Sequence, residues 1–408
     1  MKKIWIMNHY AIPPRIGGIT RHFDFAEELA KRGYDVTIFA SSFDHKTREE
    51  TLEKGLKYKE EKISNVKFVW IKTTPYKKND LKRVLNIISF SKNLYFVAKK
   101  FENPDTIIAS SFHPLTCIVG YLLAKKKNAR YIAEIRDIWP QSAIDMGAIS
   151  ENGIIAKTLR LIEDFIYKRA KKIIVLFPKA VDYIISRGYP KDKAIYIPNG
   201  TSIERFDQII KNGKSPDVES ILKEHVGYFK ALYLGALGRA NAMETIVEAA
   251  KYVQDIVGEK IHFLIVGDGP EKEKLEKMAN ELNLKNIYFY QPIKKYDVPL
   301  LLNGVDVALI SMHNLAVYKY GISLNKLFDY LCSQKPIVFA ADVINDIVKE
   351  ANAGITTKPG DAKQFADAII KIYNMSDEKR KELGQNGRDY IEKHHDIKVL
   401  ADRLESIL

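Results

Sequence analysis

The chain of 408 residues is 46% hydrophobic and 28% charged, which excludes a disordered or low-complexity protein and favours a soluble globular one with two domains. Its formal charge of +13 favours anionic partners, such as phosphorylated substrates, anionic lipid or nucleic acid. Only two cysteines occur, Cys117 and Cys332, and they form no CxxC pair, so we expect a reducing compartment without a disulfide framework or a zinc site.

The chain begins with a short apolar run, Ile4–Met7, which polar residues end. This run is too short for the core of a signal peptide, so Lys3–Asn8 is predicted as a first buried strand. The longest apolar stretch, Ile107–Ala124, is interrupted by His113 and Pro114. It therefore predicts a strand, a loop and a helix rather than a membrane span.

Short β-branched runs alternate with segments of helical period along the chain, which predicts parallel sheets with helices on both faces. The length predicts two such units, and the turn residues Pro198–Gly200, after a last short strand, mark their boundary. The stretch Glu378–Leu408 is helical and charged, and no strand is expected in it. The predicted strands are Lys3–Asn8, Asp35–Ala40, Val66–Ile71, Thr106–Ala109, Arg130–Ile135, Lys172–Leu176, Lys230–Leu234, His262–Val266, Asn286–Tyr290, Val305–Ile310 and Pro336–Phe339, and the predicted helices include Thr20–Arg32, Ile154–Ala170, Ala242–Val257, Glu271–Leu282 and Leu324–Cys332.

Three strand-to-helix junctions, Pro14–His22, Leu234–Arg239 and Tyr320–Lys326, combine glycine with a cation. A helix N-terminus carries partial positive charge, so a cation there costs roughly 0.3 kcal/mol or more unless an anion is bound. Glycine lets the backbone approach that anion closely. The three junctions together predict a phosphorylated ligand, although each cation alone could equally lie on the surface. The residues expected to contact the ligand are Gly17, Gly18 and Arg21 in the first junction, Gly238 and Arg239 in the second, and Gly321, Ile322, Ser323, Asn325 and Lys326 in the third.

Lys326 and Asp329 are three residues apart and share one helix face. An ammonium group for a diphosphate and a carboxylate for the vicinal hydroxyls of a sugar would then lie side by side. An ordinary salt bridge between the two residues explains the spacing equally well.

Other nucleotide-binding and metal-binding motifs are incomplete. The sequence contains no GxxxxGK[ST], and Val266–Pro270 follows a strand but lacks the full GxGxxG pattern, so neither a P-loop nor a nicotinamide site is favoured. It contains no HExxH and no clustered His and Cys ligands, so we expect no catalytic metal and no cofactor.

These motifs occur in an order that resembles the retaining glycosyltransferases of family 4, which have the GT-B architecture of two Rossmann-like α/β domains facing across a cleft. GGITRH and LAKRGYDVTIFA resemble the N-terminal loop and second strand of the family, and PNG resembles its hinge. YLGALGRANAMETIVEAA, FLIVGDGPEKEKL, NIYFYQPIKKYDVPLLLNGVDVALI and SLNKLFDYLCSQKPIVFA resemble its donor domain in order. EIRDIWPQS at 134–142 narrows the resemblance to the branch of bacterial N-acetyl-fucosamine transferases and similar enzymes of surface-polysaccharide synthesis.

The resemblance implies an acceptor-binding domain at 1–198, a donor-binding domain at 199–389 and a C-terminal helix, about 390–408, that packs back on the first domain. It implies that Asp329 binds the donor ribose, that Arg239 and Lys326 bind the diphosphate, and that main-chain groups near Ile293 hold the base. Electrostatic stabilisation by such preorganised charges would assist departure of the nucleotide. Gly17 and Gly18 are expected beside the β-phosphate and the acceptor, and His113 matches a family histidine near the donor sugar.

The chain also departs from the family pattern. Gly321 stands where the first Glu of the family's Glu-x7-Glu motif is expected, and Asn241 and Ala242 occupy the region of a Lys that usually follows Gly-Arg. Lys326 could compensate for that Lys. Asp137 could orient the acceptor, serve as a base, or form a salt bridge with Arg136, and His113 could simply form a strand-end turn.

The expected reaction is transfer of a sugar, such as an N-acetylated hexosamine or deoxyhexosamine, from a UDP-sugar to a lipid-linked or polysaccharide acceptor of capsule or O-antigen synthesis. We expect a cytoplasmic protein, with possible peripheral association at the inner face of the membrane. The stretch Leu81–Phe101 mixes basic and apolar residues at helical spacing, which suits either a membrane surface or a core-packed helix with a basic outer face.

Two other functions remain open at this stage. An epimerase of the same architecture would share the diphosphate site but need no acceptor. A non-catalytic polyanion-binding module would suit the positive charge, but no RNA-binding motif or aromatic-interleaved basic patch supports nucleic acid as a partner.

Overall fold

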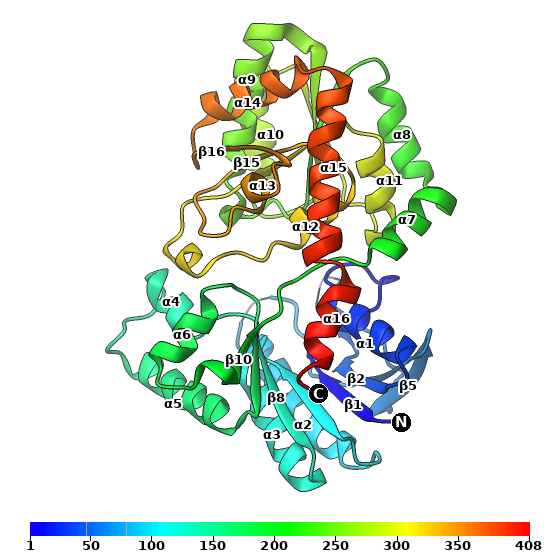
Figure 1. The fold of residues 1–408 in the computed structure, drawn as a ribbon, viewed down its shortest axis with the longest axis vertical. Coiled ribbons are helices and arrows are strands. Elements are labelled where there is room, and N and C mark those ends of the chain that lie inside the picture. The colour runs from blue at the N-terminus through cyan, green and yellow to red at the C-terminus, as the bar shows by residue number, and fades with distance from the viewer. Residues whose placement is uncertain (46, 79) are drawn as a thin grey trace. The chain divides into compact units, whose positions relative to one another are not determined.

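A computed structural model describes residues 1–45, 47–78 and 80–408 of the chain (Figure 1). The chain divides into two compact units: unit 1 comprises Met1–Pro198 and Leu400–Leu408, and unit 2 comprises Asn199–Val399. The C-terminal segment expected on the first domain began near residue 390, but only its last nine residues belong to unit 1. The reason is hydrophobic burial, because Ile391 lies in the core of unit 2.

Unit 1 is built on an eight-stranded sheet with the order β10-β9-β8-β7-β1-β2-β6-β5. All its strands pair in parallel except β5, which pairs antiparallel with β6. The strands are β1 (Lys3–Met7), β2 (Asp35–Ser41), β5 (Tyr58–Ile63), β6 (Val66–Ile71), β7 (Thr106–Ser110), β8 (Arg130–Ile135), β9 (Lys172–Val175) and β10 (Ala194–Tyr196), and a separate hairpin is formed by β3 (Phe43–Asp44) and β4 (Glu49–Glu50).

The edge strand β5 and the β3–β4 hairpin were not predicted. The sequence of β5, YKEEKI, is mostly charged and contains only one β-branched residue. Charged side chains on an exposed edge strand discourage pairing with another chain. The same charged side chains interrupt any apolar run, which is why the strand was not predicted from the sequence.

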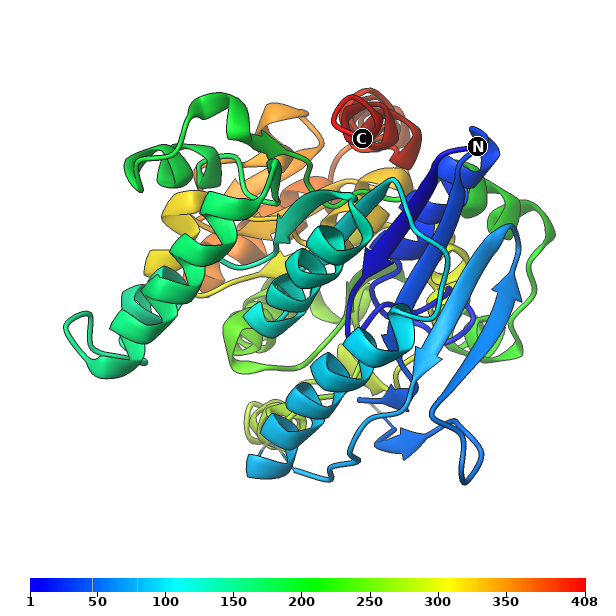
Figure 2. The same cartoon turned by 90° about the horizontal axis from the view of Figure 1, so that it is seen from below.

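The helices of unit 1 cover the sheet. Helices α2, α3 and α5 lie side by side (Figure 2). The last helix packs beside α1, since Arg32 bonds to Asp402 at 2.6 Å and to Glu405 at 2.9 Å. The helices are α1 (Arg21–Lys31), α2 (Leu81–Ala98), α3 (Pro114–Lys127), α4 (Gln141–Asp145), α5 (Ile154–Arg169), α6 (Ala180–Ser186) and α16 (Ile397–Glu405), which crosses the boundary between the units.

Unit 2 contains a six-stranded parallel sheet with the order β13-β12-β11-β14-β15-β16. Successive residues of its strands face opposite sides, so Leu232 joins one hydrophobic core and Tyr233 the other. Both faces are therefore covered, as all-parallel sheets require. The strands are β11 (Phe229–Leu234), β12 (Ile261–Val266), β13 (Ile287–Tyr290), β14 (Val307–Ser311), β15 (Ile337–Ala340) and β16 (Gly354–Thr357).

The α-helices of unit 2 flank this sheet, and short 3₁₀ turns, η2 (Arg239–Asn241) and η4 (Lys295–Asp297), precede α9 and α11. They are α7 (Ile203–Asn212), α8 (Pro216–Glu224), α9 (Met243–Val257), α10 (Lys272–Glu281), α11 (Val298–Asn303), α12 (Asn325–Cys332), α13 (Ile347–Glu350), α14 (Ala362–Tyr373) and α15 (Asp377–His394).

Candidate functional site

The strand order of unit 2 creates a crevice at the carboxyl ends of its two central strands, β11 and β14. The chain proceeds from β11 outward to β12 and β13, and then returns to place β14 on the other side of β11. The loops that leave the carboxyl ends of β11 and β14 therefore diverge, and ligands of open parallel sheets bind at such a switch point.

Lys326, the second residue of α12, places its ammonium group in this crevice. Its Nζ donates to the hydroxyl of Tyr233 at 2.8 Å and to Oδ1 of Asn241 at 3.3 Å, and it lies 4.1 Å from the centroid of the Tyr233 ring. Both partners are neutral, and burial lowers the pKa of Lys326 to about 7. Among the residues that the structure describes, no Asp or Glu forms an ion pair with Lys326. The crevice therefore contains a desolvated amine that an anion would stabilise in its charged form.

The loop that follows β11 contacts Lys326 through Gly235. Hydrogen bonds to a second glycine-containing loop, Val266–Pro270, hold it in place. Gly235 donates to Val266 O at 3.0 Å, and Leu237 donates to Asp268 O at 2.9 Å. A Cβ atom on Gly267 would lie 1.9 Å from Gly235 O, so only glycine permits this approach. The Val266–Pro270 segment thus supports the cation-bearing loop.

Arg239 lies on the same loop. It was expected in the first turn of a helix, but it lies before that helix. It opens the 3₁₀ turn η2, and α9 begins only at Met243, after Ala242 in the left-handed conformation with φ 42°. Its side chain is 91% exposed and forms an ion pair with Glu271 at 3.5 Å. The predicted conflict with the helix dipole therefore does not arise, because the first turn of α9 contains Glu244.

Asp329 does not pair with Lys326. Its carboxylate bonds to the ammonium of Lys295, and it accepts a bond of 3.4 Å from the hydroxyl of Thr201. Of the two readings of the Lys326–Asp329 spacing, the simple salt bridge is therefore wrong. Ile293, two residues before Lys295, packs against the hydrophobic core that contains Phe328, the neighbour of Asp329. The segment near Ile293, expected to hold the base, therefore lies beside Asp329, expected to hold the ribose.

In the third junction, two groups that were predicted to contact the ligand form hydrogen bonds to other residues of the protein. The N–H of Ile322 donates to Asn345 Oδ1 at 2.8 Å, and Ser323 Oγ accepts a bond of 2.9 Å from the N–H of Asn199. These two groups therefore hold the loop, and the contact of Ile322 and Ser323 with the ligand stays a prediction. Gly321 has φ 99°, a conformation that favours glycine, and Asn325 is the first residue of α12.

In unit 1 the cation of the first junction is neutralised within the fold, which corrects the prediction that Arg21 contacts the ligand. Arg21 is buried, and its guanidinium bonds to Glu134 at 2.8 Å and to the carbonyls of Ile197 and Pro198. Glu134 also bonds to His22 Nε2 at 2.6 Å, and these partners hold the pKa of Glu134 well below its usual range. A single buried acid thus balances the cation.

The switch point of unit 1 lies between β1 and β7, and neutral polar groups gather there. His9 Nδ1 and His113 Nε2 are 2.9 Å apart, and Asn8 bonds to Ser110 at 2.9 Å. Burial lowers the pKa of His113 to about 4, so this histidine is a neutral hydrogen-bonding group at physiological pH.

The glycines of the first junction have φ 85° at Gly17 and φ 96° at Gly18, backbone conformations that favour glycine. Gly17, Arg15 and His9 line a cavity of about 280 Å³ within unit 1. An ion pair in which Nη2 of Arg15 donates to both carboxylate oxygens of Glu61, at 2.7 and 2.8 Å, forms part of its wall.

Asp137 follows β8 and is exposed. Desolvation raises the pKa of Asp137, and the nearby charge of Arg136 partly opposes this rise. Among the described residues, however, Asp137 and Arg136 form no ion pair. The salt-bridge alternative is therefore not observed.

Sequence reasoning missed four residues that shape the two sites: Tyr233, Asn241, Lys295 and Glu134. Glu134 had a detectable signal, since a carboxylate in an otherwise apolar buried strand requires a partner. The other three had no local signal, because their partners lie 34 to 93 residues away in sequence.

Residues 1–45, 47–78 and 80–408 contain neither a candidate membrane span nor a candidate metal cluster. None of the helices there is sufficiently long and apolar to span a bilayer. No group of three or more His, Cys, Asp or Glu side chains there has the arrangement of a metal site.

Comparisons with known proteins agree with these two units. The model of "Glycosyltransferase Family 4" matches residues 16–205, and that of "Glycosyl transferases group 1" matches residues 217–390. WcaI of Escherichia coli, a glycosyl transferase named for colanic acid biosynthesis, is 27% identical over 73% of this chain and 74% of its own.

Solved structures show the same fold. Sucrose-phosphate synthase of Thermosynechococcus elongatus has a TM-score of 0.74 at 18% identity, covering 100% of this chain and 98% of its own. HepE of Anabaena, in complex with UDP-glucose, has a TM-score of 0.69 at 14% identity, covering 100% and 99%. The fold is therefore GT-B, and the chain belongs to the family 4 glycosyltransferases.

Proposed function

We propose that this glycosyltransferase transfers a sugar from a UDP-sugar, with retention at the anomeric carbon, to a lipid-linked or polysaccharide acceptor of bacterial surface-polysaccharide synthesis. The sugar would be an N-acetylated hexosamine or deoxyhexosamine. The similarity to WcaI supports a role in polysaccharide synthesis, and the fold shared with HepE in complex with UDP-glucose supports a UDP-linked donor.

The observation that carries the proposal is the ammonium of Lys326 at the switch point of unit 2. It is partly buried, its two hydrogen-bond partners are neutral, and the Gly235 backbone adjoins it. A diphosphate would supply the missing negative charge, and Arg239, on the same loop, is exposed and able to reach a bound anion.

In the proposed reaction the bond between the anomeric carbon and the β-phosphate oxygen breaks, and its electron pair leaves with UDP. A new bond forms between that carbon and the acceptor oxygen, whose proton passes to the leaving phosphate or to solvent. Lys326 and Arg239 stabilise the charge that develops on the phosphate, which is the electrostatic contribution of preorganised cations. Because these cations supply that charge, we propose that catalysis needs no metal.

Asp329 is the proposed partner of the donor ribose, with Lys295 holding its carboxylate. Gly321 stands at the position of the first Glu of the Glu-x7-Glu motif, so no carboxylate there can bind the donor sugar. Other groups must therefore recognise the donor sugar. His113 and the main chain at Gly17 and Gly18 are our candidates for that role. The two buried free thiols, Cys117 and Cys332, suit a cytoplasmic location.

The test is binding of UDP measured by calorimetry, followed by a panel of UDP- and GDP-sugars with prenyl-diphosphate-linked acceptors. We expect UDP to bind and the Lys326→Met variant to lose most of that affinity. The matched control is Lys335→Met, which removes another partly buried lysine of unit 2 whose neighbour, Asp306, supplies a negative charge. Equal UDP affinity in the wild type and in Lys326→Met would contradict the proposal, and formation of an epimerised UDP-sugar without acceptor would favour an epimerase.

The proposal includes peripheral docking of unit 1 on anionic membranes. On α2, Leu81, Val84, Leu85 and Ile88 share one face and are 47–80% exposed, whereas the opposite side of the helix is buried. The outer face is thus apolar rather than mainly basic. Residues 1–198 contain 36 Lys and Arg against 21 Asp and Glu, and residues 199–399 contain 27 against 28. The positive charge of the chain therefore lies in the unit that carries this stripe, as binding to anionic lipid requires.

Sedimentation with vesicles tests this part. We expect the protein to pellet with phosphatidylglycerol vesicles at low salt and to bind neutral vesicles less. Leu85→Glu with Ile88→Glu should abolish pelleting, whereas Ile256→Glu, at a 61% exposed position in unit 2, should not. Equal pelleting with neutral and anionic vesicles would contradict docking by charge.

A further inference from the structure

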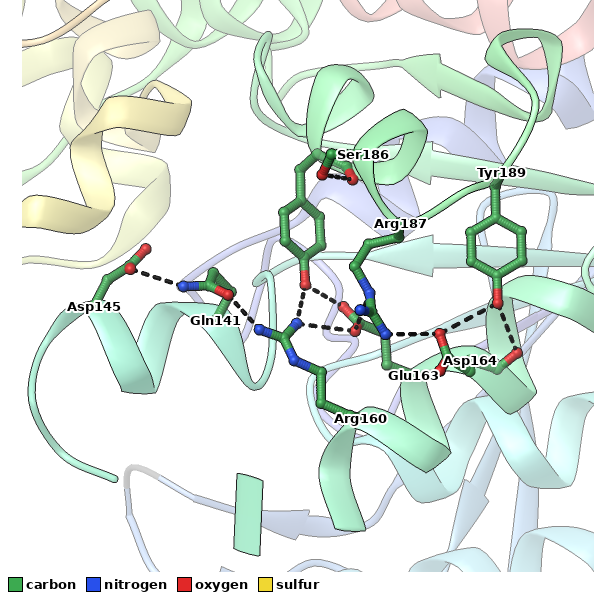
Figure 3. Close-up of polar contacts among 9 residues, drawn as sticks. Gln141, Asp145, Arg160, Glu163, Asp164, Ser186, Arg187 and Tyr189 are labelled. Carbon is green, nitrogen blue, oxygen red and sulfur yellow. Dashed lines mark hydrogen bonds and ion pairs between the residues drawn. The ribbon is translucent and has the colours of Figure 1, made fainter. Parts of the chain in front are cut away.

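A polar network in unit 1 holds the short helix that follows strand β8 (Figure 3). At its centre is Glu163 of α5, whose side chain is 2% exposed. Glu163 accepts bonds from Arg160 at 3.1 Å and from Tyr183 at 2.7 Å, and it pairs with Arg187 at 3.2 Å. Arg160 reaches further and donates to the side chain of Gln141, the first residue of α4. The network therefore ties α4 to α5 and α6.

This tie fixes the far end of the loop Arg136–Pro140. The near end is fixed as well, because the N–H of Arg136 donates to Ser111 Oγ at 3.2 Å. Within the loop and the first turn of α4, Trp139 N bonds to Asp137 O at 2.9 Å and Ser142 N bonds to Ile138 O at 2.7 Å. The loop is thus held at both ends and braced between them.

The loop presents an aromatic ring and a carboxylate at the ligand-binding edge of the sheet. The Trp139 side chain is 43% exposed, and Asp137 is exposed beside it. Strand β8 neighbours β7, so this position is one strand, about 5 Å, from the switch point of unit 1. The hydrogen bonds described above hold the loop on both sides of this ring, and exposed loop side chains on a fixed scaffold are frequent in binding sites.

The chemistry of the pair selects the ligand. The hollow that Asp137 and Trp139 line with Ser111 is about 30 Å³, which is room for little more than water, so a ligand must lie against the outer face of the indole. The apolar C–H face of a pyranose ring packs on such a face, and a carboxylate accepts hydrogen bonds from its hydroxyls. A carboxylate disfavours a phosphate at the same place.

We infer that Trp139 and Asp137 form a platform that binds a neutral sugar of the acceptor, and that Gln141 and Arg160 are positioning residues that hold this platform. This inference rests on the proposed transferase function. It concerns the acceptor, whereas Lys326 concerns the donor, so the two are separable by experiment.

Steady-state kinetics with prenyl-diphosphate-linked N-acetylglucosamine, or the best acceptor of the panel above, tests the platform. Trp139→Ala should raise the KM for acceptor about tenfold or more, and Trp139→Tyr should restore most of the loss. The affinity for UDP and the hydrolysis of donor without acceptor should be unchanged. Tyr252→Ala, which removes an equally exposed aromatic side chain on α9, is the control and should change neither. An unchanged acceptor KM in Trp139→Ala would overturn the inference.

A double-mutant cycle tests the positioning role. Gln141→Leu removes the contact with Arg160 while leaving Glu163 paired, and it should raise the acceptor KM about threefold. In the Trp139→Ala background the same substitution should add nothing, because the ring that it positions is gone. Additive effects would show that Gln141 acts on the acceptor KM independently of Trp139 and would overturn this part.

Saturation-transfer NMR with the methyl glycoside of N-acetylglucosamine distinguishes failure of this inference from failure of the proposed function. Transfer to the sugar ring protons in the wild type that is lost in Trp139→Ala supports the platform even if UDP does not bind. Equal transfer in both proteins overturns the platform even if UDP binds as proposed.

Discussion

Arg21 in unit 1 and Lys326 in unit 2 have similar local sequences, since each is a cation at the start of a helix near glycine. Their surroundings differ. Arg21 meets the carboxylate of Glu134 and two main-chain carbonyls, so its charge is balanced within the fold. Among the residues that the structure describes, the ammonium of Lys326 bonds to a tyrosine hydroxyl and an asparagine amide oxygen, and no carboxylate there balances its charge. A glycine and a cation at a helix start therefore do not by themselves predict an anion site, because a carboxylate elsewhere in the fold can balance the cation.

The largest effect expected from this comparison is on stability, at Arg21. Arg21→Met leaves Glu134 buried without its guanidinium, and removing one partner of a buried ion pair lowers the free energy of unfolding by about 3–5 kcal/mol. Urea denaturation measures this loss, and adding Glu134→Gln should recover part of it. If stability were unchanged while UDP affinity fell, Arg21 would be a ligand contact after all.

At Lys326 the expected loss is in turnover. Removing one preorganised charge that stabilises the transition state costs roughly 10²–10³ in kcat, and we expect this for Lys326→Met. At pH 7 the variant should be at least as stable as the wild type, because the folded state no longer bears the cost of a desolvated ammonium. A variant with wild-type kcat would remove Lys326 from the site.

The lowered pKa of Lys326 predicts that UDP affinity depends on pH. Below about pH 7 the free enzyme already carries the charged lysine, so affinity is flat. Above that pH the free lysine is neutral and binding must take up a proton, so the Kd rises by up to about tenfold per pH unit. Calorimetry between pH 7.5 and 9, in buffers of different ionisation enthalpy, measures both the affinity and the proton uptake. The Lys326→Met variant should lack this dependence, and a wild type without it would contradict the assignment.

The smallest expected change is the effect of Arg239→Ala on stability. Its side chain is 91% exposed and its ion pair with Glu271 is long, so unfolding free energy should change by no more than about 0.5 kcal/mol. Turnover should fall, but less than in Lys326→Met, because an exposed cation is screened by solvent. A larger loss in stability than in turnover would indicate a structural residue like Arg21.

The order of strands and helices in this protein is largely predictable from its amino-acid sequence. Each predicted strand has a counterpart in the structure within about two residues at either end, because buried parallel strands are continuous apolar runs and amphipathic helices separate them. The ordered motifs also identified the family, since their order and spacing reflect the whole chain. The edge strand β5 escaped because its charged composition serves its exposed edge.

Which groups face each other at the sites depends instead on contacts between residues far apart in the chain. Whether a helix-start cation meets Glu134 or Tyr233 depends on strand order, which brings together residues 93 to 113 positions apart. The same holds for Asp329, which pairs with Lys295 rather than with the lysine one helical turn away, and for Gln141, whose side chain accepts a hydrogen bond from Arg160 on another helix. Local sequence sets the conformation of a segment, but the charge and solvation of its side chains are set by neighbours that the fold supplies.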